Sequence, residues 1–472
     1  MGFIRWGEEV AGRLVAMGTG ETIAAVSTPL GEGAIGIVRI SGPRALAILR
    51  EVFVPRRPGE LRPYVLRLGW VVDPEGGRRL DEVLATWMPA GRSYTGEEMA
   101  EIQCHGGVAA VRAVLRLVLR GGARMARRGE FTLRAFLHGR LSLAEAEAVL
   151  DIIRAPGEAG LEGALRQLGG ELRETVEELS LELRRVTAAL EASLDFPDEV
   201  GEIDREALGL QLEGTAARLR ALLSGAEQGR VMREGLRLVL MGRPNVGKSS
   251  LLNALLGEER AIVTAVPGTT RDVLEEAVDW HGLPVRLCDT AGLSEGRDAA
   301  EALAVARARE AVSGADVVLL VVDGSADMAE AEELLGEVPR GRTVVVVNKG
   351  DLCDGLRRDQ WRRRLAGWPT VVVSARERWG LAELREQVVE LVAARGIRPG
   401  ESALITRERQ RRLVERCLVG VEEAREGLAA GVPADCVAVC LAEAGEALGE
   451  LLGRNVREEV LEEIFADFCV GK

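Results

Sequence analysis

The sequence contains almost no lysine: of its 61 cationic residues, three are lysine and the rest are arginine. The three are Lys248 in GRPNVGKSS, Lys349 in NKGD and Lys472 at the end of CVGK. Arginine carries a broad planar fork, whereas lysine carries a compact charge on a thin stem. A phosphate cradle and a stem that lies along a nucleotide base both favour the thin side chain. Because two of the three lysines fall in such motifs, chance is a poor explanation of the set.

The sequence also lacks an apolar run long enough to cross a membrane. Its longest runs, Val317–Val322 and Val344–Val347, have the length of β-strands, whereas a membrane-spanning helix needs about 20 apolar residues. The first segment carries Glu8 and Glu9 where an export signal would be apolar, and Met17 is an alternative start. The seven cysteines form no CxxC pair, which fits a reducing compartment. A cytoplasmic protein is therefore expected.

An excess of positive charge is absent too, since the formal net charge is −13. An RNA partner would therefore need a local basic surface, or it would dock through a second protein. The composition, 47% hydrophobic and 29% charged, is that of an ordinary globular protein. The length of 472 residues predicts roughly two to four domains.

Three patterns alternate along the chain. Residues 20–135 mix short strand-like runs with glycine and proline, which predicts a compact α+β domain. Helical spacing of apolar residues follows, with a break at Asp195–Asp198, and it returns after residue 400. Between these helical parts lie five apolar runs that predict a doubly wound sheet: Leu236–Met241, Val285–Cys288, Val317–Val322, Val344–Val347 and Val371–Val373. We therefore expect an N-terminal α+β domain (1–137) and a helical domain (138–234 and 396–472) into which a Ras-like α/β domain (235–395) is inserted.

The segment Gly242–Ser249 has the P-loop pattern GxxxxGKS and lies between a predicted strand and a predicted helix, as that pattern requires. Its backbone N–H groups and the helix N-terminus would wrap phosphates. Lys248 would reach the β- and γ-phosphates, and the Ser249 hydroxyl would bind Mg²⁺. A P-loop match alone is weak evidence, so the motifs that follow decide its meaning.

Three further motifs end later strands in the expected order. The carboxylate of Asp289 in DTAG can hold Mg²⁺ through water. The carboxylate of Asp351 in NKGD can accept hydrogen bonds from guanine N1–H and the N2 amino group, which adenine does not offer. Ser374-Ala-Arg supplies a backbone N–H for guanine O6. Together the motifs predict a GTPase domain, in which the residues that contact GTP are Asn245, Val246, Gly247, Lys248, Ser249, Ser250, Thr264, Ala265, Val266, Pro267, Gly268, Thr269, Thr270, Asp289, Thr290, Ala291, Gly292, Asn348, Lys349, Asp351, Ser374, Ala375 and Arg376.

The segment Thr264–Asp272 is a switch segment by its position, and Thr270 is the better candidate for the second Mg²⁺ hydroxyl. Leu293 follows DTAG where many GTPases have a glutamine that orients water, and leucine cannot do so. Another group must therefore orient water and neutralise charge. Asn245 is a candidate ligand for a monovalent cation at the place that an arginine finger would otherwise reach.

Taken together, the sequence closely resembles the MnmE (TrmE) family of tRNA modification GTPases, from about Thr22 onwards. The stretches that carry the resemblance are Thr22–Pro29, Gly36–Gly42, Ser93–Glu97, Glu101–Gly107, Gly129–Phe136, Leu143–Ala148, Thr264–Asp272 and Cys469–Lys472. No GTPase motif alone would produce this set.

The resemblance implies an N-terminal domain that binds tetrahydrofolate and forms a homodimer, a helical domain, and an inserted K⁺-dependent GTPase domain. Such proteins act with an FAD-dependent partner, MnmG, as a heterotetramer. They add an aminomethyl or carboxymethylaminomethyl group to the wobble uridine of certain tRNAs. Carried over by motif, the K⁺ ligands are Asn245, Thr264, Val266 and Thr269, the Mg²⁺ ligands Ser249 and Thr270, the folate contacts Arg39, Glu101, Arg140 and Lys472, and the water-orienting residue Glu301.

The chain departs from the family pattern at several positions. Arg140 replaces a lysine, which changes the geometry of a carboxylate contact. Arg128 replaces a usual proline and His138 a usual asparagine, so the local loop shape is in question. Ala304 replaces a glycine three residues after Glu301. None of these positions lies in a GTP motif.

Several of these residues have simpler interpretations. Glu101 and His105 are four apart, and a surface ion pair or a capping interaction is the ordinary reading of that spacing. Arg39 could be an edge arginine whose stem covers apolar surface. Glu301 could be a solvated carboxylate. A chain end such as Lys472 usually frays.

Cys469 is either a reactive thiol or a buried structural cysteine. Its nearness to the C-terminus does not decide between the two.

Two other functional classes remain open. A ribosome-assembly GTPase uses the same motifs as an RNA-binding switch, but it normally carries an RNA-binding module, and neither a GXXG clamp nor a basic stripe is present. A folate-binding scaffold whose GTPase regulates a partner enzyme is the other class, and the chain has no flavin fingerprint of its own.

Overall fold

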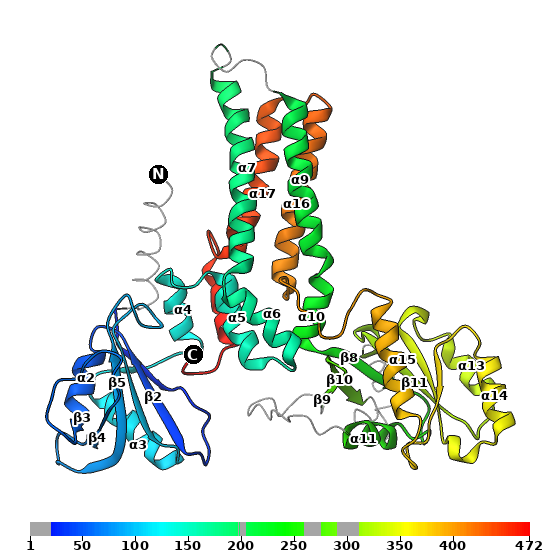
Figure 1. The fold of residues 1–472 in the computed structure, drawn as a ribbon, viewed down its shortest axis with the longest axis horizontal. Coiled ribbons are helices and arrows are strands. Elements are labelled where there is room, and N and C mark those ends of the chain that lie inside the picture. The colour runs from blue at the N-terminus through cyan, green and yellow to red at the C-terminus, as the bar shows by residue number, and fades with distance from the viewer. Residues whose placement is uncertain (1–19, 197, 199–203, 259–274, 290–310) are drawn as a thin grey trace, which may run out of the picture. The chain divides into compact units, whose positions relative to one another are not determined.

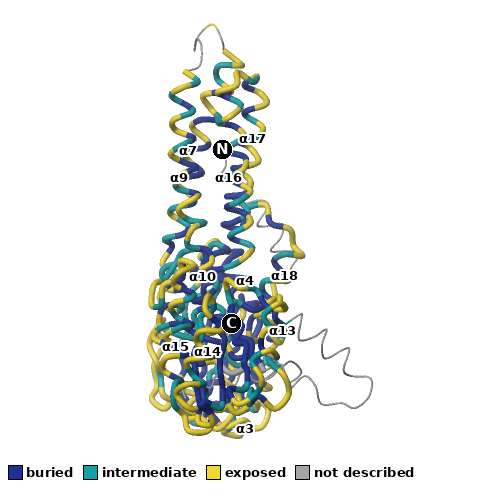
Figure 2. Tube along the Cα trace, turned by 90° about the vertical axis from the view of Figure 1, so that its right-hand side faces the viewer, coloured by how far each residue is buried: buried dark blue, intermediate teal, exposed yellow. Residues whose placement is uncertain are grey.

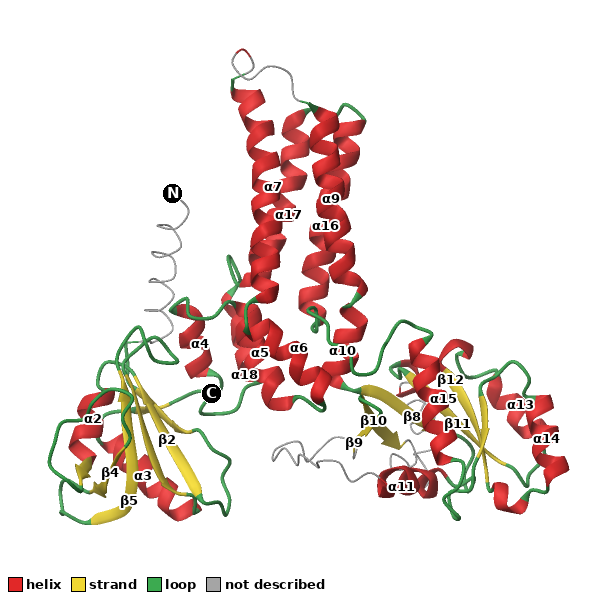
Figure 3. Cartoon of the chain, viewed as in Figure 1, coloured by secondary structure: helices red, strands yellow, loops and turns green. Residues whose placement is uncertain are grey.

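The computed structural model describes residues 20–196, 198, 204–258, 275–289 and 311–472, drawn as a ribbon in Figure 1. The chain divides into two compact units. Unit 1 comprises Met1–Leu150, Leu168–Ser180 and Gly445–Lys472, and unit 2 comprises Asp151–Gln167 and Leu181–Ala444. The last residues of the chain thus belong to the same unit as the N-terminal sheet. The predicted fold class is confirmed, because α+β, helical and α/β parts are all present (Figure 3).

Unit 1 is built on a seven-stranded sheet with the order β3-β4-β5-β6-β2-β1-β7, in which only β1 and β7 are parallel. Strand β1 alternates between two cores, since Ala24 packs on one face and Ile23 and Ala25 on the other. Helices α2 and α3 cover the first face, and Phe131 of α4 covers the second. The elements are β1 Ile23–Val26, β2 Ile35–Ser41, α2 Ala45–Val52, β3 Phe53–Pro55, β4 Arg67–Val72, β5 Arg79–Met88, β6 Met99–His105, α3 Val108–Arg120, β7 Arg124–Met125 and α4 Glu130–Leu137.

The C-terminal segment packs against the same unit. Helix α18 (Glu458–Ala466) shares an apolar cluster with α4 and with the first part of α5 (Leu143–Arg154). The rings of Phe136 and Phe465 have centroids 6.5 Å apart, and those of Phe465 and Phe468 are 5.4 Å apart. These aromatic contacts anchor the chain immediately before its last four residues.

A buried ion-pair network supports α4. The side chain of Arg134 is fully buried between Glu97 and Glu130, with N–O distances of 2.8 and 2.9 Å. Arg124 donates to both carboxylate oxygens of Glu130, at 2.8 and 3.0 Å. Burial alone would raise the pKa of Glu130, but hydrogen bonds from Arg124 and from the Arg127 backbone, with the charge of Arg134, lower it to about 2. Every charge in this network therefore has an opposite charge beside it, as buried charges require.

Unit 2 contains a bundle of long helices. It comprises α9 (Arg205–Ser224), α16 (Glu408–Ala429), the part of α7 (Glu171–Asp195) from Leu181, and the part of α17 (Ala434–Leu452) up to Ala444. Buried positions recur along each helix at helical spacing (Figure 2), for example Leu208, Leu212 and Leu219 on α9. Helix α7 ends at Asp195, where the break was predicted. The short helices α6 (Glu158–Leu168) and α10 (Ala226–Glu234) precede the α/β part.

The α/β part of unit 2 is a six-stranded sheet with the order β13-β12-β11-β8-β10-β9. All neighbouring strands are parallel except β9, which is antiparallel to β10. One face carries the core with α11 and α15, and the other carries the core with α13 and α14. The elements are β8 Leu236–Met241, α11 Lys248–Glu258, β9 Glu275–Trp280, β10 Leu283–Asp289, β11 Val317–Asp323, α13 Ala329–Leu335, β12 Thr343–Asn348, α14 Gly355–Arg364, β13 Thr370–Val372 and α15 Leu381–Ala393.

The five predicted strands of this sheet are confirmed to within two residues at either end. They were predictable because a parallel strand with helices on both faces is a continuous apolar run. Strand β9 was missed because its sequence, EEAVDW, carries three acids and it lies at the edge of the sheet. Within the described ranges, no helix is both long and apolar enough to cross a membrane.

We expect the substitution Glu130→Gln to destabilise unit 1 by about 3 kcal/mol at pH 7, because it leaves the buried Arg134 without half of its charge partners. The pKa of Glu130 is depressed from an ordinary 4.5 to about 2. Its stabilisation is therefore complete above about pH 4.5 and is lost as the pH falls through about 2. Urea unfolding at a series of pH values measures both effects.

The matched control for this prediction is Glu82→Gln, which removes an exposed ion pair with Arg56. An exposed pair contributes little, so this variant should unfold like the wild type. If Glu130→Gln gave a stability curve parallel to that of the wild type between pH 5 and pH 2, the linkage assigned to Glu130 would be wrong.

Candidate functional site

The nucleotide motifs meet at one edge of the α/β sheet. Gly242–Ser249 follows β8, Asp289 ends β10, Asn348 ends β12 and Ser374 lies just after β13. These strands are mutually parallel, so their carboxyl ends lie at the same edge. This is the edge at which open α/β sheets bind ligands.

The P-loop is shaped by two glycines with positive φ angles. Gly242 has φ 156° and Gly247 has φ 94°. A Cβ at Gly242 would collide with the Val321 carbonyl, and a Cβ at Gly247 would collide with the Asn348 amide. Asn245, at the exposed tip, also has a positive φ of 63°. The loop therefore wraps closely against two strands that come later in the chain.

The P-loop lysine lies inside the loop that it follows. Lys248 is the first residue of α11, and its Nζ donates to the carbonyl oxygens of Gly242 at 2.8 Å and of Arg243 at 2.9 Å. Ser249 follows it and is exposed. A helix N-terminus, an ammonium group and a hydroxyl are thus concentrated in one place, which suits an anion with a bound cation.

Asn348 joins the two ends of the site. Its Nδ2 donates to the Val246 carbonyl in the P-loop at 2.9 Å, and its Oδ1 accepts from the backbone N–H of Ala375 at 3.1 Å. The Asn348 side chain is almost completely buried. One amide group therefore fixes the distance between the phosphate loop and the loop predicted to face the guanine base.

The carboxylate that is predicted to read the base is exposed and is oriented by a serine. The Ser374 hydroxyl donates to Asp351 Oδ1 at 2.6 Å, and this hydrogen bond, with the charges of Arg376 and Arg358, lowers the pKa of Asp351. The carboxylate is therefore ionised and acts only as an acceptor at neutral pH. An acceptor-only group matches the N1–H and N2 amino donors of guanine.

Lys349 has a partner that sequence reasoning missed. Its Nζ lies 2.6 Å from Asp323 Oδ2, and its backbone is left-handed with φ 58°. Asp323 is the last residue of β11. An acidic residue at the end of a buried parallel strand was the available signal, because that place faces the ligand edge of the sheet.

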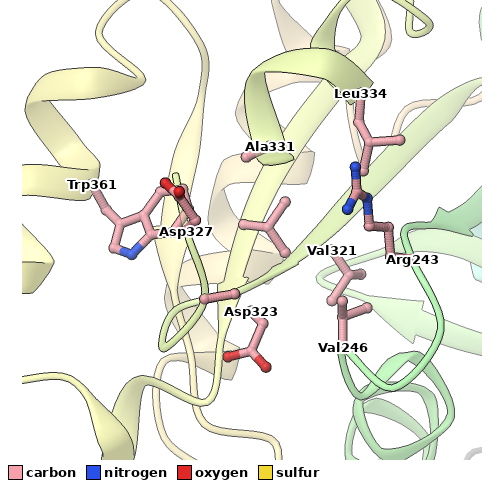
Figure 4. A pocket seen from close by; sticks show the side chains of 10 residues that line it. Arg243, Val246, Val321, Asp323, Asp327, Ala331, Leu334 and Trp361 are labelled. Atoms are coloured by element: carbon pink, nitrogen blue, oxygen red, sulfur yellow. The ribbon is translucent and has the colours of Figure 1, made fainter. Parts of the chain in front are cut away.

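A small pocket lies behind the P-loop, beside the Lys349–Asp323 pair (Figure 4). Of the residues predicted to contact GTP, only Val246 lines it. Its walls are mostly apolar, so we assign it no part in nucleotide binding. The lining residues are Arg243, Val246, Val321, Val322, Asp323, Ala326, Asp327, Ala331, Leu334 and Trp361.

A second cluster of charged side chains lies in unit 1. Arg39 and Glu101 are opposite one another on β2 and β6, with Nε–Oε1 2.9 Å apart and both side chains mostly buried. The Arg39 guanidinium lies 5.7 Å from the ring centres of both Tyr94 and Phe131, and its Nη1 donates to the Gly471 carbonyl at 3.3 Å. The C-terminal residues thus end beside this pair.

Lys472 is held against the same cluster. An oxygen of its terminal carboxylate accepts from the Phe131 N–H at 3.2 Å. Burial and the neighbouring charge of Arg39 lower the pKa of its ammonium group, while Glu101 and Cys469 act in the opposite direction. Two cationic side chains, the carboxylates of Glu101 and of the chain end, and two aromatic rings therefore lie around one place on the sheet.

The tail that carries Lys472 is fixed along its length. Arg128 Nε donates to the Phe468 carbonyl at 2.9 Å, and its backbone forms a bridge with Val470. The Ser27 hydroxyl donates to the Gly471 carbonyl at 3.1 Å. Gly471 has φ 100°, and a Cβ there would collide with the Val26 carbonyl, so only glycine fits.

Two protein-family models match the chain. The one described as "GTP-binding protein TrmE N-terminus" covers residues 22–140, and the one described as "MnmE helical domain" covers residues 143–469. The chain belongs to the MnmE family of tRNA modification GTPases. The predicted resemblance is thereby confirmed.

Curated relatives agree with this assignment. The tRNA modification GTPase MnmE of Carboxydothermus hydrogenoformans is 45% identical over 458 residues, which are 96% of this chain and 99% of that protein. MnmE of Moorella thermoacetica is 47% identical over 96% of this chain and 99% of its own length. Among solved structures, the G domain of the T. maritima FeoB iron transporter is 28% identical over 33% of this chain and 98% of that one, with a TM-score of 0.26.

Several of the predicted site residues lie outside the described ranges. They are Thr264, Ala265, Val266, Pro267, Gly268, Thr269, Thr270, Thr290, Ala291, Gly292 and Glu301. Asp289 is described only as the end of β10. Among the described residues, no group of three or more His, Cys, Asp or Glu could hold a metal ion. Of the predicted cation ligands, only Ser249 and Asn245 lie within the described residues.

Two simpler interpretations are wrong. Glu101 and His105 lie on strand β6, where residues four apart are too distant to pair. Glu101 pairs with Arg39, and His105 pairs with Asp81 at 2.6 Å. Arg39 is not on an edge strand, because β2 lies between β6 and β1.

Two readings of the C-terminus are also corrected. Cys469 is exposed, so the reading of a buried structural cysteine is wrong. Lys472 is not a frayed end, because its backbone and side chain both contact unit 1. Among the four predicted folate contacts, Arg39, Glu101 and Lys472 lie together. Arg140 instead donates to the Gly91 carbonyl at 3.3 Å.

Proposed function

We propose that the chain is a K⁺-dependent GTPase that, with an FAD-dependent MnmG-type partner, adds an aminomethyl or carboxymethylaminomethyl group to C5 of the wobble uridine of certain tRNAs. The one-carbon unit comes from tetrahydrofolate bound to unit 1. The observation that carries the proposal is that the C-terminal tail meets the Arg39–Glu101 pair in a chain that also brings the P-loop, NKGD and Ser374 to one edge of its second sheet.

The described residues account for how GTP is bound. The backbone of the P-loop and the N-terminus of α11 surround the phosphates, and Lys248 supplies a cation there. Ser249, exposed on the first turn of α11, fits a Mg²⁺ ligand. Bound Mg²⁺ would neutralise charge on the transferred phosphoryl group. Asp351 reads the base, and Asn348 fixes the spacing between the two ends.

Hydrolysis needs a water-orienting group and an extra positive charge. We assign these to Glu301 and to K⁺ held by Asn245, Thr264, Val266 and Thr269. Asn245 fits such a ligand because it carries an amide oxygen and is exposed at the tip of the P-loop. Equal rates of GTP hydrolysis in Na⁺ and K⁺ would contradict the K⁺ part of the proposal.

The cluster in unit 1 fits a folate. Its two cations, Arg39 and Lys472, suit carboxylates, and its carboxylate, Glu101, suits the amino groups of a pterin ring. The half-buried Tyr94 ring offers a flat surface for the same ring, while the fully buried Phe131 ring supports Arg39. Cys469, exposed two residues before Gly471, is placed to act as a thiol beside it.

Unit 1 also has an apolar surface that suits a homodimer. Leu68 and Leu84 are partners across β4 and β5, and both are exposed. Tyr64, Val65 and Leu66, immediately before β4, are exposed as well. Contiguous exposed apolar residues usually mark a protein interface. Light scattering checks this part, since a monomeric mass would contradict it.

The function is tested in cells by mass spectrometry of tRNA nucleosides. Deleting the gene should remove the aminomethyl-type wobble-uridine groups selectively. The intact gene should restore them and Lys248→Ala should not, because that variant lacks the ammonium group at the phosphates. Arg364→Ala, which breaks only a surface pair with Glu332, is the matched control and should restore them. Unchanged nucleosides with accumulated ribosome precursors would instead favour the ribosome-assembly alternative.

The folate site is tested by calorimetric titration of the full chain with tetrahydrofolate. We expect Arg39→Gln to weaken binding by about tenfold or more, because one charge-assisted contact is worth about 1.5–3 kcal/mol. Arg56→Gln, which changes an exposed arginine immediately after β3, should bind as the wild type does.

The variant Arg140→Gln, in the same titration, tests whether Arg140 is a folate contact, as the family motif predicts, or lies outside the site, as its position in the structure indicates. Because Arg140 contacts Gly91 rather than the Arg39 cluster, its loss should matter less than that of Arg39. If the two substitutions weakened binding equally, Arg140 would belong to the site after all. Unaltered affinity in Arg39→Gln would remove the folate site from this cluster.

A further inference from the structure

A tryptophan outside the GTP motifs packs directly on the guanine-reading loop. Trp379 precedes α15, and its ring lies against Gly350, the third residue of NKGD. A Cβ at Gly350 would lie 2.7 Å from Trp379 Cη2 and 3.0 Å from its Cζ2. The ring therefore occupies the place where any other residue would have a side chain. The path of the loop between Lys349 and Asp351 is set by this contact.

An arginine of α14 touches both members of this pair. The Arg358 guanidinium lies 4.8 Å from the centre of the Trp379 ring, and its Nη2 donates to the Gly350 carbonyl at 2.9 Å. Helix α14 is itself fixed at its start, because Asp354 caps it by accepting from the Arg357 N–H at 2.8 Å. Arg358 thus connects a fixed helix to the ring and to the loop.

The backbone of Trp379 holds the second guanine loop. Its carbonyl accepts from the Ser374 N–H at 3.1 Å, and the two residues form an isolated bridge. Ser374 in turn donates its hydroxyl to Asp351. Trp379 therefore reaches Asp351 by two routes, one through its ring and Gly350 and one through its backbone and Ser374.

We propose that Trp379 and Arg358 are positioning residues for guanine recognition: they fix the Asp351 carboxylate so that it accepts from both N1–H and the N2 amino group. The proposal deepens the GTP site of the proposed function and rests on it. Neither residue touches the phosphates, so neither contributes to hydrolysis itself. Without the packing of Trp379 on Gly350, the Asp351 carboxylate can shift. A carboxylate that accepts hydrogen bonds from two guanine donors at once is sensitive to shifts of about 1 Å.

The test compares GDP with inosine diphosphate, which differs only by lacking the N2 amino group, in calorimetric titrations of the full chain. In Trp379→Leu we expect GDP binding to weaken about tenfold or more and inosine diphosphate binding to change by less than about threefold. The preference for GDP then falls, because the contact to the N2 amino group is lost. In hydrolysis assays KM for GTP should rise while kcat is unchanged.

The chain offers a matched control in Trp368. This half-buried ring also carries an arginine, Arg340, at 5.5 Å from its centre, and it packs on the same side of the sheet. Trp368→Leu should lower stability in the same way but leave the preference for GDP as in the wild type. Trp379→Phe, which keeps an aromatic ring against Gly350, should retain most of the preference.

Equal weakening of GDP and inosine diphosphate in Trp379→Leu would overturn the proposal, and so would unaltered binding of both. If Trp379→Leu does not fold, Arg358→Gln replaces it under the same criteria, because that variant leaves the ring in place. The proposed function fails in a different way: the wild-type chain would then bind GDP no better than ADP.

Discussion

The geometry of the nucleotide site depends on one buried amide. Asn348 binds the P-loop through Val246 and the last guanine loop through Ala375, so the two ends of the site cannot move apart independently. An amide serves here because it offers a donor on one side and an acceptor on the other. Around this fixed amide lie Lys349, Asp351 and Trp379. Loss of the amide would let their side chains move away from their present positions.

The sequence predicted the motif-bearing edge of the α/β sheet in unit 2 well. It predicted the surroundings of Arg39 and Glu101 in unit 1 less well. Motifs such as NKGD are local, and strands buried on both faces are visible as apolar runs. Strand order is not local, so the simpler interpretation of Arg39 as an edge arginine was wrong, because Arg39 lies in the middle of the sheet. The spacing of Glu101 and His105 was read with the helical period, but strand pairing decides their partners. Asp323 and Trp379 act through contacts between distant segments, for which no motif exists.

The use of cations is divided in an unusual way between the two residue types. Arginine makes the contacts that need several donors. Arg134, for example, pairs its guanidinium with two carboxylates in a fully buried position. Each lysine ends in a narrow place: Lys248 under the P-loop carbonyls, Lys349 on Asp323, and Lys472 beside Arg39. A strongly acidic chain can therefore still present concentrated positive charge at both of its clusters.

The contacts of the C-terminal tail in unit 1 join residues that are very far apart in the sequence. Ser27 and Gly471, joined by a hydrogen bond, are 444 positions apart in sequence. Closing so long a loop is entropically costly and slow, and the whole of unit 2 lies within it. The cluster around Arg39 is therefore complete only when the two ends of the chain have met. Proteolytic loss of a few C-terminal residues would leave a well-folded sheet whose cluster is open.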